Sequence, residues 1–306
     1  MNKVIIVAGA TASGKSELGV ELAKILDTEI ISCDSMQIYK GLDVGTAKIT
    51  SSQMQGVKHH LIDVVEPNES FSVSEWRERA TRVIDELHAK GKIAIVVGGT
   101  GLYIDSLVYQ LSFFCNGDES LREKLKKDLE SQGAQKMHDL LKSLDPIDAE
   151  KIHPNNTKRL LRALEIYYST GGVKSDRQER KRNQDYDICL VVIGRDRRET
   201  YERIDRRVDE MWRLGLVDEV KRIIGEGLAD WDCQSMQAIG YKEFKDYFDG
   251  KCEPEQVKNQ IKINSRHYAK RQISWLKRYD FGRYFDVDKS FSEAIKYAVD
   301  WANGKE

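Results

Sequence analysis

Residues 9–16 read Gly-Ala-Thr-Ala-Ser-Gly-Lys-Ser, which fits the phosphate-binding pattern G-x-x-x-x-G-K-[ST]. A run rich in Ile and Val, Lys3–Ala8, precedes this stretch, and an amphipathic helical segment, Glu17–Leu26, follows it. A strand that turns through a glycine-rich loop into a helix presents backbone N–H groups and a helix N-terminus to a phosphate group. The stretch therefore predicts a phosphate-binding loop between the first strand and the first helix of an α/β fold.

Every residue of this loop is a candidate ligand of the phosphate groups: Gly9, Ala10, Thr11, Ala12, Ser13, Gly14, Lys15 and Ser16. Lys15 adds a positive charge, and the hydroxyl of Ser16 is the expected protein ligand of Mg²⁺. An ordinary nucleotide hydrolase also has an Asp at the end of a second apolar strand. Here the strand predicted at Ile93–Gly98 leads into Gly99-Thr100-Gly101 with no acid. The loop predicts a diphosphate or a triphosphate ligand, and the pattern alone does not distinguish them.

Unbroken apolar runs continue the strand pattern beyond the first strand. They lie at Glu29–Cys33, Ile93–Gly98 and Ile188–Gly194, and a helical pattern at Ser74–Lys90 precedes the second of these. Strands without polar alternation are typical of a parallel sheet that is buried on both faces. The predicted fold class is α/β, with a parallel sheet core like that of P-loop NTPases.

The strand and helix alternation stops after Val108. Helical patterns occupy much of residues 118–170, and residues 173–187 contain almost nothing to bury, so we expect a mobile loop there. We therefore predict a helical insertion at 114–187 in a core made of 1–113 and 188–306. The C-terminal region of that core is predicted to be helical at Glu199–Gly225, Ser235–Asp249, Glu255–Tyr279 and Phe291–Asn303.

The composition excludes several classes of protein. The 306 residues are 40% hydrophobic with a net charge of −1, which excludes global disorder and gives no overall basicity that would indicate nucleic acid. The apolar runs are far shorter than the roughly 20 residues of a membrane helix. The first residues do not resemble a secretion signal, and the five scattered cysteines favour buried thiols over disulfides or zinc. We expect a cytoplasmic protein.

Two polar residues follow the predicted strands at 29–33 and 93–98. Because the carboxyl ends of parallel strands point into the ligand crevice, Asp34 and Thr100 are both expected to face the phosphate site. The run Asp34-Ser35-Met36-Gln37 fits a turn-capping role for Asp34 equally well. The adjacent His59 and His60 are expected to form hydrogen bonds and not to bind a metal.

Basic residues are concentrated near the C-terminus. Residues 257–283 contain eight Lys or Arg side chains and one acid, Asp280. Lys258, Lys262, Arg266 and Lys270 recur every four residues and share one helix face, opposite the apolar Val257, Ile261, Tyr268 and Trp275. This face fits either a phosphate backbone or an ordinary solvated surface. A second basic cluster, Arg177, Arg180, Lys181 and Arg182, has the same two interpretations.

Eight motifs in chain order resemble those of the tRNA dimethylallyltransferases, also called tRNA isopentenyltransferases. They are Gly-Ala-Thr-Ala-Ser-Gly-Lys-Ser at 9–16, Asp-Ser-Met-Gln-Ile-Tyr at 34–39, Gly-Thr-Ala-Lys at 45–48, His-His-Leu-Ile-Asp at 59–63, Gly-Gly-Thr-Gly-Leu-Tyr at 98–103, Lys-Arg-Leu-Leu-Arg-Ala-Leu-Glu at 158–165, Gln-Ala-Ile-Gly-Tyr-Lys-Glu at 237–243 and Tyr-Ala-Lys-Arg-Gln at 268–272. Ala10 stands where the family usually has Pro, which a loop that binds through its backbone tolerates. The zinc finger of the eukaryotic members is not found, so the resemblance is to the bacterial type.

The resemblance implies transfer of a dimethylallyl group from dimethylallyl diphosphate to N6 of the adenine at position 37, next to the tRNA anticodon, with release of diphosphate. It makes Asp34 the base for the adenine amine, while Lys15, Thr100, Arg207 and Mg²⁺ on Ser16 stabilise the leaving group. Arg203 and Arg206 are neighbouring alternatives to Arg207. The residues that the resemblance assigns to tRNA are Asp34, Ser35, Met36, Gln37, Thr100, Arg122, Lys158, Arg159, Leu160, Leu161 and Arg162.

The expected partners are therefore the anticodon stem-loop of tRNA and dimethylallyl diphosphate, with Mg²⁺ as cofactor and a monomeric chain. A kinase of the same fold would explain residues 9–16 but not the missing acid after Val97. A dimethylallyltransferase that acts on free adenine nucleotides would have little use for the insertion or the basic helix. A non-enzymatic RNA-binding module is disfavoured by the phosphate loop together with Asp34.

Overall fold

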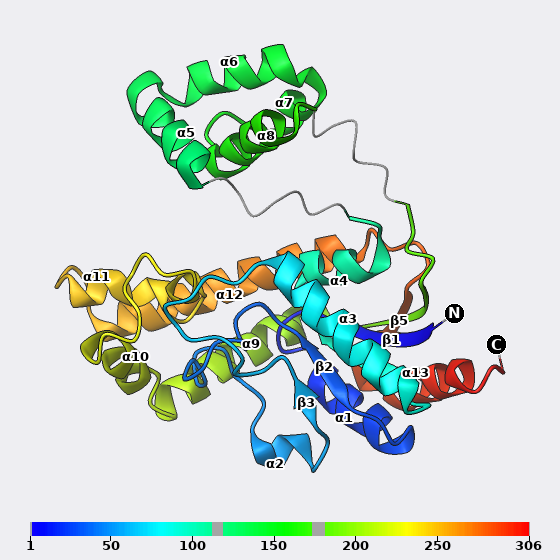
Figure 1. The fold of residues 1–306 in the computed structure, drawn as a ribbon. Helices are drawn as coiled ribbons and strands as arrows, with labels where there is room; N and C mark the ends of the chain where they lie inside the picture. The colour runs from blue at the N-terminus through cyan, green and yellow to red at the C-terminus, as the bar shows by residue number, and fades with distance from the viewer. Residues whose placement is uncertain (1, 112–118, 173–180, 306) are drawn as a thin grey trace. The chain divides into compact units, whose positions relative to one another are not determined.

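A six-stranded parallel sheet forms the core of the computed structural model, which describes residues 2–111, 119–172 and 181–305 (Figure 1). The strand order is β3-β2-β4-β1-β5-β6, and every pair of neighbours is parallel. The strands are β1 (Asn2–Gly9), β2 (Ile30–Cys33), β3 (His59–His60), β4 (Ala94–Gly98), β5 (Tyr186–Gly194) and β6 (Arg283–Asp286). The predicted α/β class with a parallel sheet is confirmed.

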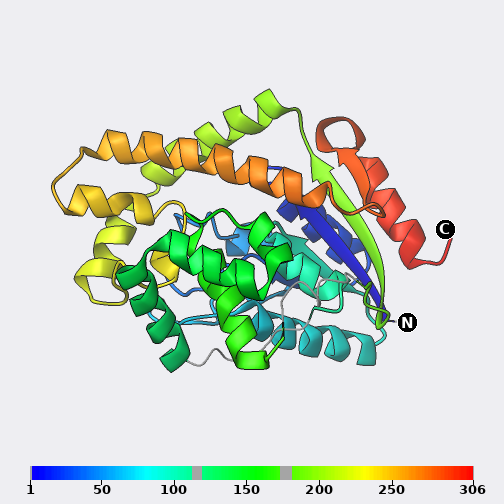
Figure 2. The ribbon, with the colours of Figure 1, turned by 90° about the horizontal axis from the view of Figure 1, so that it is seen from above.

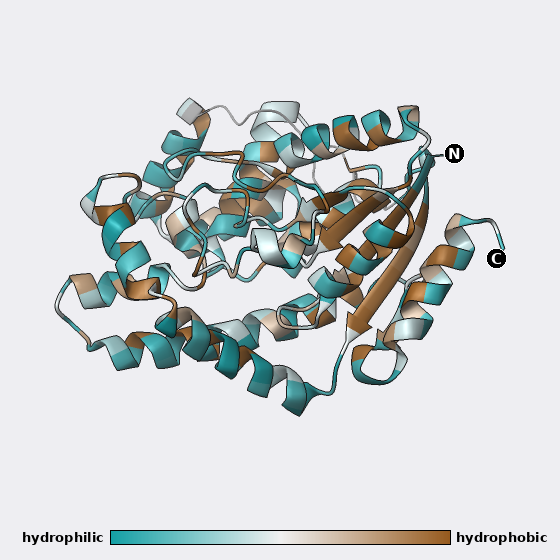
Figure 3. Ribbon diagram, turned by 90° about the horizontal axis from the view of Figure 1, so that it is seen from below, coloured by the Kyte–Doolittle hydropathy of each residue, from teal (hydrophilic) through white to brown (hydrophobic). Residues whose placement is uncertain are grey.

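The central strands are buried on both faces. Consecutive residues of β1 from Val4 to Ala8 have at most 1% of their surface exposed, and β4 is buried throughout. The strands accordingly appear as continuous hydrophobic ribbons in Figure 3, whereas the helices around them have mixed faces. Because the strands are parallel, the chain leaves β1, β2 and β4 at the same edge of the sheet, at Gly9, Asp34 and Gly99.

Helices cover both faces of this sheet. On one face α1 and α13 pack against each other and against the strands, and on the other α3, α4 and α12 do so (Figure 2). The long helix α12 also lies along α9. The helices of this part of the chain are α1 (Lys15–Ile25), α2 (Ser51–Met54), α3 (Val73–Ala89), α4 (Gly101–Val108), α9 (Arg197–Arg213), α10 (Leu216–Gly225), α11 (Lys245–Phe248), α12 (Pro254–Leu276) and α13 (Val287–Ala302).

The chain divides into two compact units. The first contains residues 1–108 and 183–306, and the second contains residues 109–182. The second unit has its own apolar core, formed mainly by Leu125, Met137, Leu141, Leu160 and Leu164. Its helices are α5 (Glu119–Gln132), α6 (Ala134–Leu144), α7 (Pro146–Lys151) and α8 (Thr157–Thr170). The second unit therefore packs its helices around a core of its own.

The two chain segments that lead into and out of the second unit run side by side. The backbone N–H of Asn183 donates to the Val108 carbonyl at 2.8 Å, and Tyr109 and Arg182 form an antiparallel bridge.

The predicted boundary between 113 and 114 lies outside the described residues, as do Cys115, Arg177, Arg180 and most of the loop predicted at 173–187. The predicted boundary between 187 and 188 lies inside β5.

Several predicted elements have different bounds in the structure. The helix predicted at Glu199–Gly225 is two helices, because Gly215 adopts a left-handed φ of 92° between α9 and α10. The helix predicted at Ser235–Asp249 consists of two short 3-10 turns and α11. The free cysteines Cys33 and Cys189 are buried as expected, whereas Cys233 and Cys252 are partly exposed.

Candidate active site

The phosphate loop connects β1 to α1 at the centre of the sheet. A Cβ on Gly9 would lie 2.4 Å from Ser13 Oγ and 2.8 Å from the Ile193 carbonyl oxygen, so only glycine fits where the loop folds over β5. Gly14 has a φ of 93° immediately before the first residue of α1. These two glycines give the loop the shape in which the N-terminus of α1 faces a bound anion.

Lys15 folds back over this loop. Its Nζ donates a hydrogen bond to the Ala10 carbonyl at 3.3 Å. Burial, followed by the charge of the nearby Arg207, lowers the pKa of Lys15 to about 8, and the charge of Asp34 partly opposes both effects. A desolvated ammonium of this kind interacts strongly with an anion, because little water remains to be displaced.

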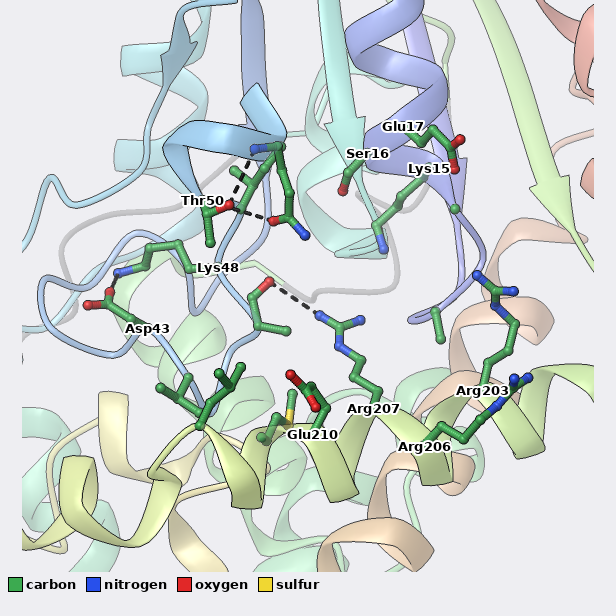
Figure 4. Close-up of a pocket in the computed structure, with 18 of the residues that line it drawn as sticks. Lys15, Ser16, Glu17, Asp43, Lys48, Thr50, Arg203, Arg206, Arg207 and Glu210 are labelled. Atoms are coloured by element: carbon green, nitrogen blue, oxygen red, sulfur yellow. Dashed lines mark hydrogen bonds and ion pairs between the residues drawn. The ribbon is translucent and has the colours of Figure 1, made fainter. Parts of the chain in front are cut away.

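Arg207 projects from α9 onto the phosphate loop (Figure 4). Its Nη1 donates to Thr11 Oγ1 at 3.1 Å, and its Nη2 donates to the carbonyls of Thr46 and Ala47 at 3.5 and 3.3 Å. Burial lowers the pKa of Arg207, and the charge of Asp34 opposes this shift. Arg203 and Arg206 instead lie near Glu199 on their own helix, at 3.8 and 3.4 Å. Among the described residues, Arg207 is the one of these three arginines that forms a hydrogen bond with the loop.

Asp34 follows β2 and has the turn geometry that the sequence allowed. Its Oδ1 accepts hydrogen bonds from the backbone N–H groups of Met36 at 2.9 Å and Gln37 at 3.3 Å. Within the described parts of the chain, its other oxygen, Oδ2, accepts no hydrogen bond. One oxygen therefore caps the turn, and the carboxylate also lines a cavity. The two interpretations of Asp34 are thus compatible.

Thr100 lies behind this turn. Its Oγ1 accepts a hydrogen bond from the Ser35 N–H at 3.1 Å, while Tyr268 on α12 lines the same cavity as Asp34. Burial raises the pKa of Tyr268, so its hydroxyl stays protonated. The described residues that line the two cavities at this site do not include Thr100. Thr100 holds the Asp34 turn in place and does not itself form the wall.

Two cavities meet at the phosphate loop. The smaller, about 320 Å³, is lined among others by Lys15, Ser16, Asp34, Ser35, Met36, Gln37, Arg207 and Arg271. The larger, about 840 Å³, is drawn in Figure 4, and its walls include Asp43, Lys48, Arg203, Arg206 and Glu210. Lys15, Ser16 and Arg207 line both cavities. The structure thus brings the predicted cations, the predicted metal ligand and Asp34 to one place.

Gln272 on α12 is a site residue that the analysis of individual residues missed. Its Oε1 accepts a hydrogen bond from the Thr11 N–H at 2.8 Å, and its Nε2 donates to the Gly99 carbonyl at 3.0 Å. The side chain is 6% exposed. Because Gln272 accepts the hydrogen bond of the Thr11 N–H, that N–H is not free to bind a phosphate group in this structure. The only sequence signal was the last position of the motif at 268–272.

Most of the basic face of α12 packs against α9. Lys258 and Lys262 both pair with Asp209 on α9, at 2.9 and 2.7 Å, and Arg266 donates to Asp205 Oδ1 at 2.9 Å. Three of the four basic side chains are therefore paired with acids of a neighbouring helix, an arrangement that the sequence pattern did not predict. Lys270, in contrast, is exposed.

Two of the predicted tRNA-binding residues of the second unit share one carboxylate. Arg122 on α5 and Arg162 on α8 both bind Glu165, at 2.6 and 2.8 Å, and the Glu165 side chain is only 6% exposed. Lys158 and Arg159 are exposed, and Leu161 is half-buried. Leu160 is fully buried in the core of the unit, so we correct its assignment: the side chain packs and does not face a ligand.

The oxygen donors at this site fit a hard cation. The Ser16 hydroxyl and the Asp34 carboxylate are the ligand types that Mg²⁺ prefers. Three or more His, Cys, Asp or Glu side chains that could hold a metal by themselves do not occur together in the described ranges. His60 binds Glu29 at 2.6 Å and His59 binds the Val57 carbonyl at 2.9 Å, as expected for hydrogen-bonding residues.

The described residues form no helix with the length and apolar character of a membrane span.

Comparisons with known proteins agree with this geometry. A family described as IPP transferase matches residues 37–279. The tRNA dimethylallyltransferase of Caldanaerobacter subterraneus is 45% identical over 99% of this chain and 98% of its own, and that of Clostridioides difficile is 47% identical over 94% and 92%. Among solved structures, the tRNA isopentenylpyrophosphate transferase of Bacillus halodurans has a TM-score of 0.74 at 42% identity, covering 100% of this chain and 97% of its own. A eukaryotic dimethylallyltransferase acting on tRNA has a TM-score of 0.86 at 30% identity, with coverages of 99% and 79%. The chain therefore belongs to the IPP transferase family and is an enzyme that transfers a dimethylallyl group to tRNA.

Proposed function

We propose that the enzyme transfers the dimethylallyl group of dimethylallyl diphosphate to N6 of the adenine at position 37 of tRNA. The observation that supports this most directly is the cavity of about 320 Å³ that Lys15, Arg207 and Asp34 all line. The two cations suit a diphosphate, and the carboxylate suits an amine that must lose a proton. The same cavity also contains an uncharged segment, Ser35–Gln37, against which a base can lie.

The reaction breaks the allylic C–O bond and forms a bond from that carbon to N6 of the adenine. Negative charge develops on the diphosphate oxygen as the bond breaks, and the positive charges of Lys15 and Arg207 stabilise it. The lone pair of N6 is delocalised into the ring, so the amine is a weak nucleophile. The Asp34 carboxylate takes the proton that N6 loses, and the products are the alkylated base and diphosphate.

Mg²⁺ is the proposed cofactor, held by the Ser16 hydroxyl together with oxygens of the diphosphate. When bound, it supplies further positive charge to the leaving group. Thr100 is proposed to help position the adenine through Ser35, whose N–H donates a hydrogen bond to the Thr100 hydroxyl oxygen. It is not proposed to contact the diphosphate.

The nucleic-acid substrate must leave its stack to reach this cavity. An adenine next to the anticodon is stacked in the loop, so it has to be extruded before N6 meets Asp34. Ser35, Met36 and Gln37 are the proposed contacts of the extruded base. In the second unit, Arg122, Lys158, Arg159, Leu161 and Arg162 are the proposed contacts to the anticodon stem-loop.

The enzyme is also proposed to act as a monomer and to modify tRNA in the cytoplasm.

The test uses labelled dimethylallyl diphosphate with Mg²⁺ and separate pools of tRNA, AMP and ATP. Label is expected in tRNA alone, with one diphosphate released per label. A matched transcript with guanine in place of the adenine at position 37 controls for the site and should stay unlabelled. Label in AMP or ATP would instead support the transferase of free nucleotides, and transfer of phosphate from ATP to an acceptor, with ADP formed at a comparable rate, would support the kinase.

A further inference from the structure

We propose that Glu219, on α10, is a positioning residue that acts through the loop Asp43–Ala47 on Arg207 and Gln37. The inference rests on the proposed function of Arg207. Glu219 lines neither of the two cavities described above. Any effect of this carboxylate on the reaction must therefore pass through the groups that it holds.

Glu219 binds the start of the loop through both carboxylate oxygens. Oε2 accepts hydrogen bonds from the N–H groups of Asp43 at 2.9 Å and Val44 at 2.8 Å. Oε1 accepts from the N–H of Gly45 at 3.0 Å and from the hydroxyl of Tyr241 at 2.6 Å. A carboxylate that accepts several N–H groups from consecutive residues fixes their backbone, since each of these bonds is charge-assisted.

Tyr241 closes the other side of the loop. A Cβ on Gly45 would approach the Tyr241 ring to 2.5 Å, and a Cβ on Gly240 would lie 2.9 Å from the Gly45 carbonyl. The loop backbone thus lies directly against a fully buried aromatic ring. Burial, followed by the charge of Glu219, raises the pKa of Tyr241 well above its usual range, so the hydroxyl remains a donor.

The far end of the loop supports the reaction site. The carbonyls of Thr46 and Ala47 both accept hydrogen bonds from Arg207 Nη2, at 3.5 and 3.3 Å, and from Gln37 Nε2, at 3.3 Å each. These two carbonyls therefore orient the cation that contacts the phosphate loop and a proposed contact of the base. A shift of the loop would move both side chains together.

Replacing Glu219 by Gln changes the hydrogen bonds while keeping the shape. Each oxygen of Glu219 accepts from two donors, so the amide NH₂ of Gln meets at least one N–H donor wherever it points. The loop must then move or break some of its hydrogen bonds. The matched control is Glu226→Gln at the C-terminal cap of the same helix, because Glu226 is exposed and lies 4.0 Å from Arg222.

The experiment measures single-turnover rates on full-length enzyme with saturating tRNA and dimethylallyl diphosphate, alongside thermal melts. We expect Glu219→Gln to lower the rate per folded molecule by about 10–100-fold, the scale of a displacement of about 1 Å at a reacting centre. Glu226→Gln should keep the wild-type rate. Glu219→Asp, which keeps the charge, should recover part of the rate and replaces Glu219→Gln if that variant does not fold.

A double-mutant cycle with Arg207→Ala separates the two proposals. If Glu219 acts partly through Arg207, the Gln substitution should slow the Arg207→Ala enzyme by a smaller factor than it slows the wild-type enzyme, since the two effects are not additive. Full additivity, or an unchanged rate with only a lower melting temperature, would overturn the role of Glu219. An Arg207→Ala enzyme with the wild-type rate would instead overturn the proposed function of Arg207.

Discussion

Gln272 accepts a hydrogen bond from the backbone N–H of Thr11 at 2.8 Å, so one side chain of α12 holds the phosphate loop. The same amide donates to the Gly99 carbonyl at 3.0 Å. The loops that follow β1 and β4 are therefore joined by a single side chain. A Cβ on Gly99 would lie 2.3 Å from Gln272 Nε2, so a glycine at this position makes room for the amide.

Gln272→Leu should destabilise the protein and weaken diphosphate binding together. The substitution leaves the Thr11 N–H and the Gly99 carbonyl without their partner, at a cost of about 1–3 kcal/mol in the free energy of unfolding for each group kept from water. Denaturant unfolding and calorimetric titration with diphosphate measure the two effects. Gln260→Leu, on the exposed side of the same helix, is the control. Unchanged diphosphate affinity in a stable Gln272→Leu enzyme would show that this bond does not shape the loop.

Diphosphate binding should take up a proton at mildly alkaline pH. The pKa of Lys15 is about 8 before an anion binds, and an anion beside the ammonium raises it. At about pH 8.5 the free enzyme is therefore mostly deprotonated at Lys15 and the complex is protonated, which corresponds to up to about one proton per site. Titrations in two buffers of different ionisation enthalpy measure this uptake. Lys15→Arg should abolish it, and uptake that persists in this variant would assign the proton to another group.

Asp34→Asn separates proton transfer from the turn. Asn retains an acceptor for the Met36 and Gln37 N–H groups but cannot act as a base. Turnover is expected to fall by about 10²–10⁴-fold with little change in melting temperature. Asp34→Ala should lose both activity and stability, since it also removes the turn. A stable and fully active Asp34→Asn enzyme would leave Asp34 as a turn residue alone.

The ion pairs between α12 and α9 should contribute to stability in a pH-dependent way. Hydrogen bonds from Lys258 and Lys262 lower the pKa of Asp209, so this contribution is present above the unfolded pKa of Asp and is lost as the pH falls through the folded value. Asp209 is half-exposed, so replacing both lysines by Ala should cost only about 0.5–1 kcal/mol at neutral pH. Unfolding at neutral pH and at low pH measures the difference, which should disappear in acid.

The tRNA affinity should distinguish paired from exposed lysines on this helix. Replacing the exposed Lys270 and Lys277 by Ala should reduce the slope of log affinity against log salt by about 0.7–0.9 for each phosphate group that the variant no longer neutralises. The Lys258 and Lys262 double variant is the matched control, because those charges are already neutralised by Asp209. Equal slopes for all three proteins would show that this end of α12 does not contact tRNA.

The local features of the fold could be predicted from the sequence, and the long-range ones could not. The phosphate loop and the central strands have patterns that are complete within a few residues. The strand β3 has two residues and β6 has four, too few for any periodicity. The break at Gly215 was missed because the amphipathic pattern continues on both sides of it.

The candidate site shows the same division. Lys15, Ser16 and Asp34 were found because motifs mark them, and the contact of Arg207 with the phosphate loop selects it over its neighbours. Gln272 binds the backbone of Thr11, which is 261 positions away in the sequence, and Glu219 binds the backbone of Asp43, which is 176 positions away. Neither residue has a charge pattern or spacing that signals such a contact. The ion pairs of α12 were missed for the same reason, since the acids that pair with its lysines lie on α9.

The hydrogen bond between Asn183 and Val108 bears on how the chain folds. Strand β5 must pair with β1 although a whole helical unit separates it from β4, and closing so long a loop costs entropy. The bridge between Tyr109 and Arg182 brings the ends of that unit together. If the unit folds first around its own core, β5 reaches the sheet as if it followed α4 directly. The late steps of folding would then have the contact order of an uninterrupted α/β domain, and the speed of core formation would depend on the stability of the inserted helices.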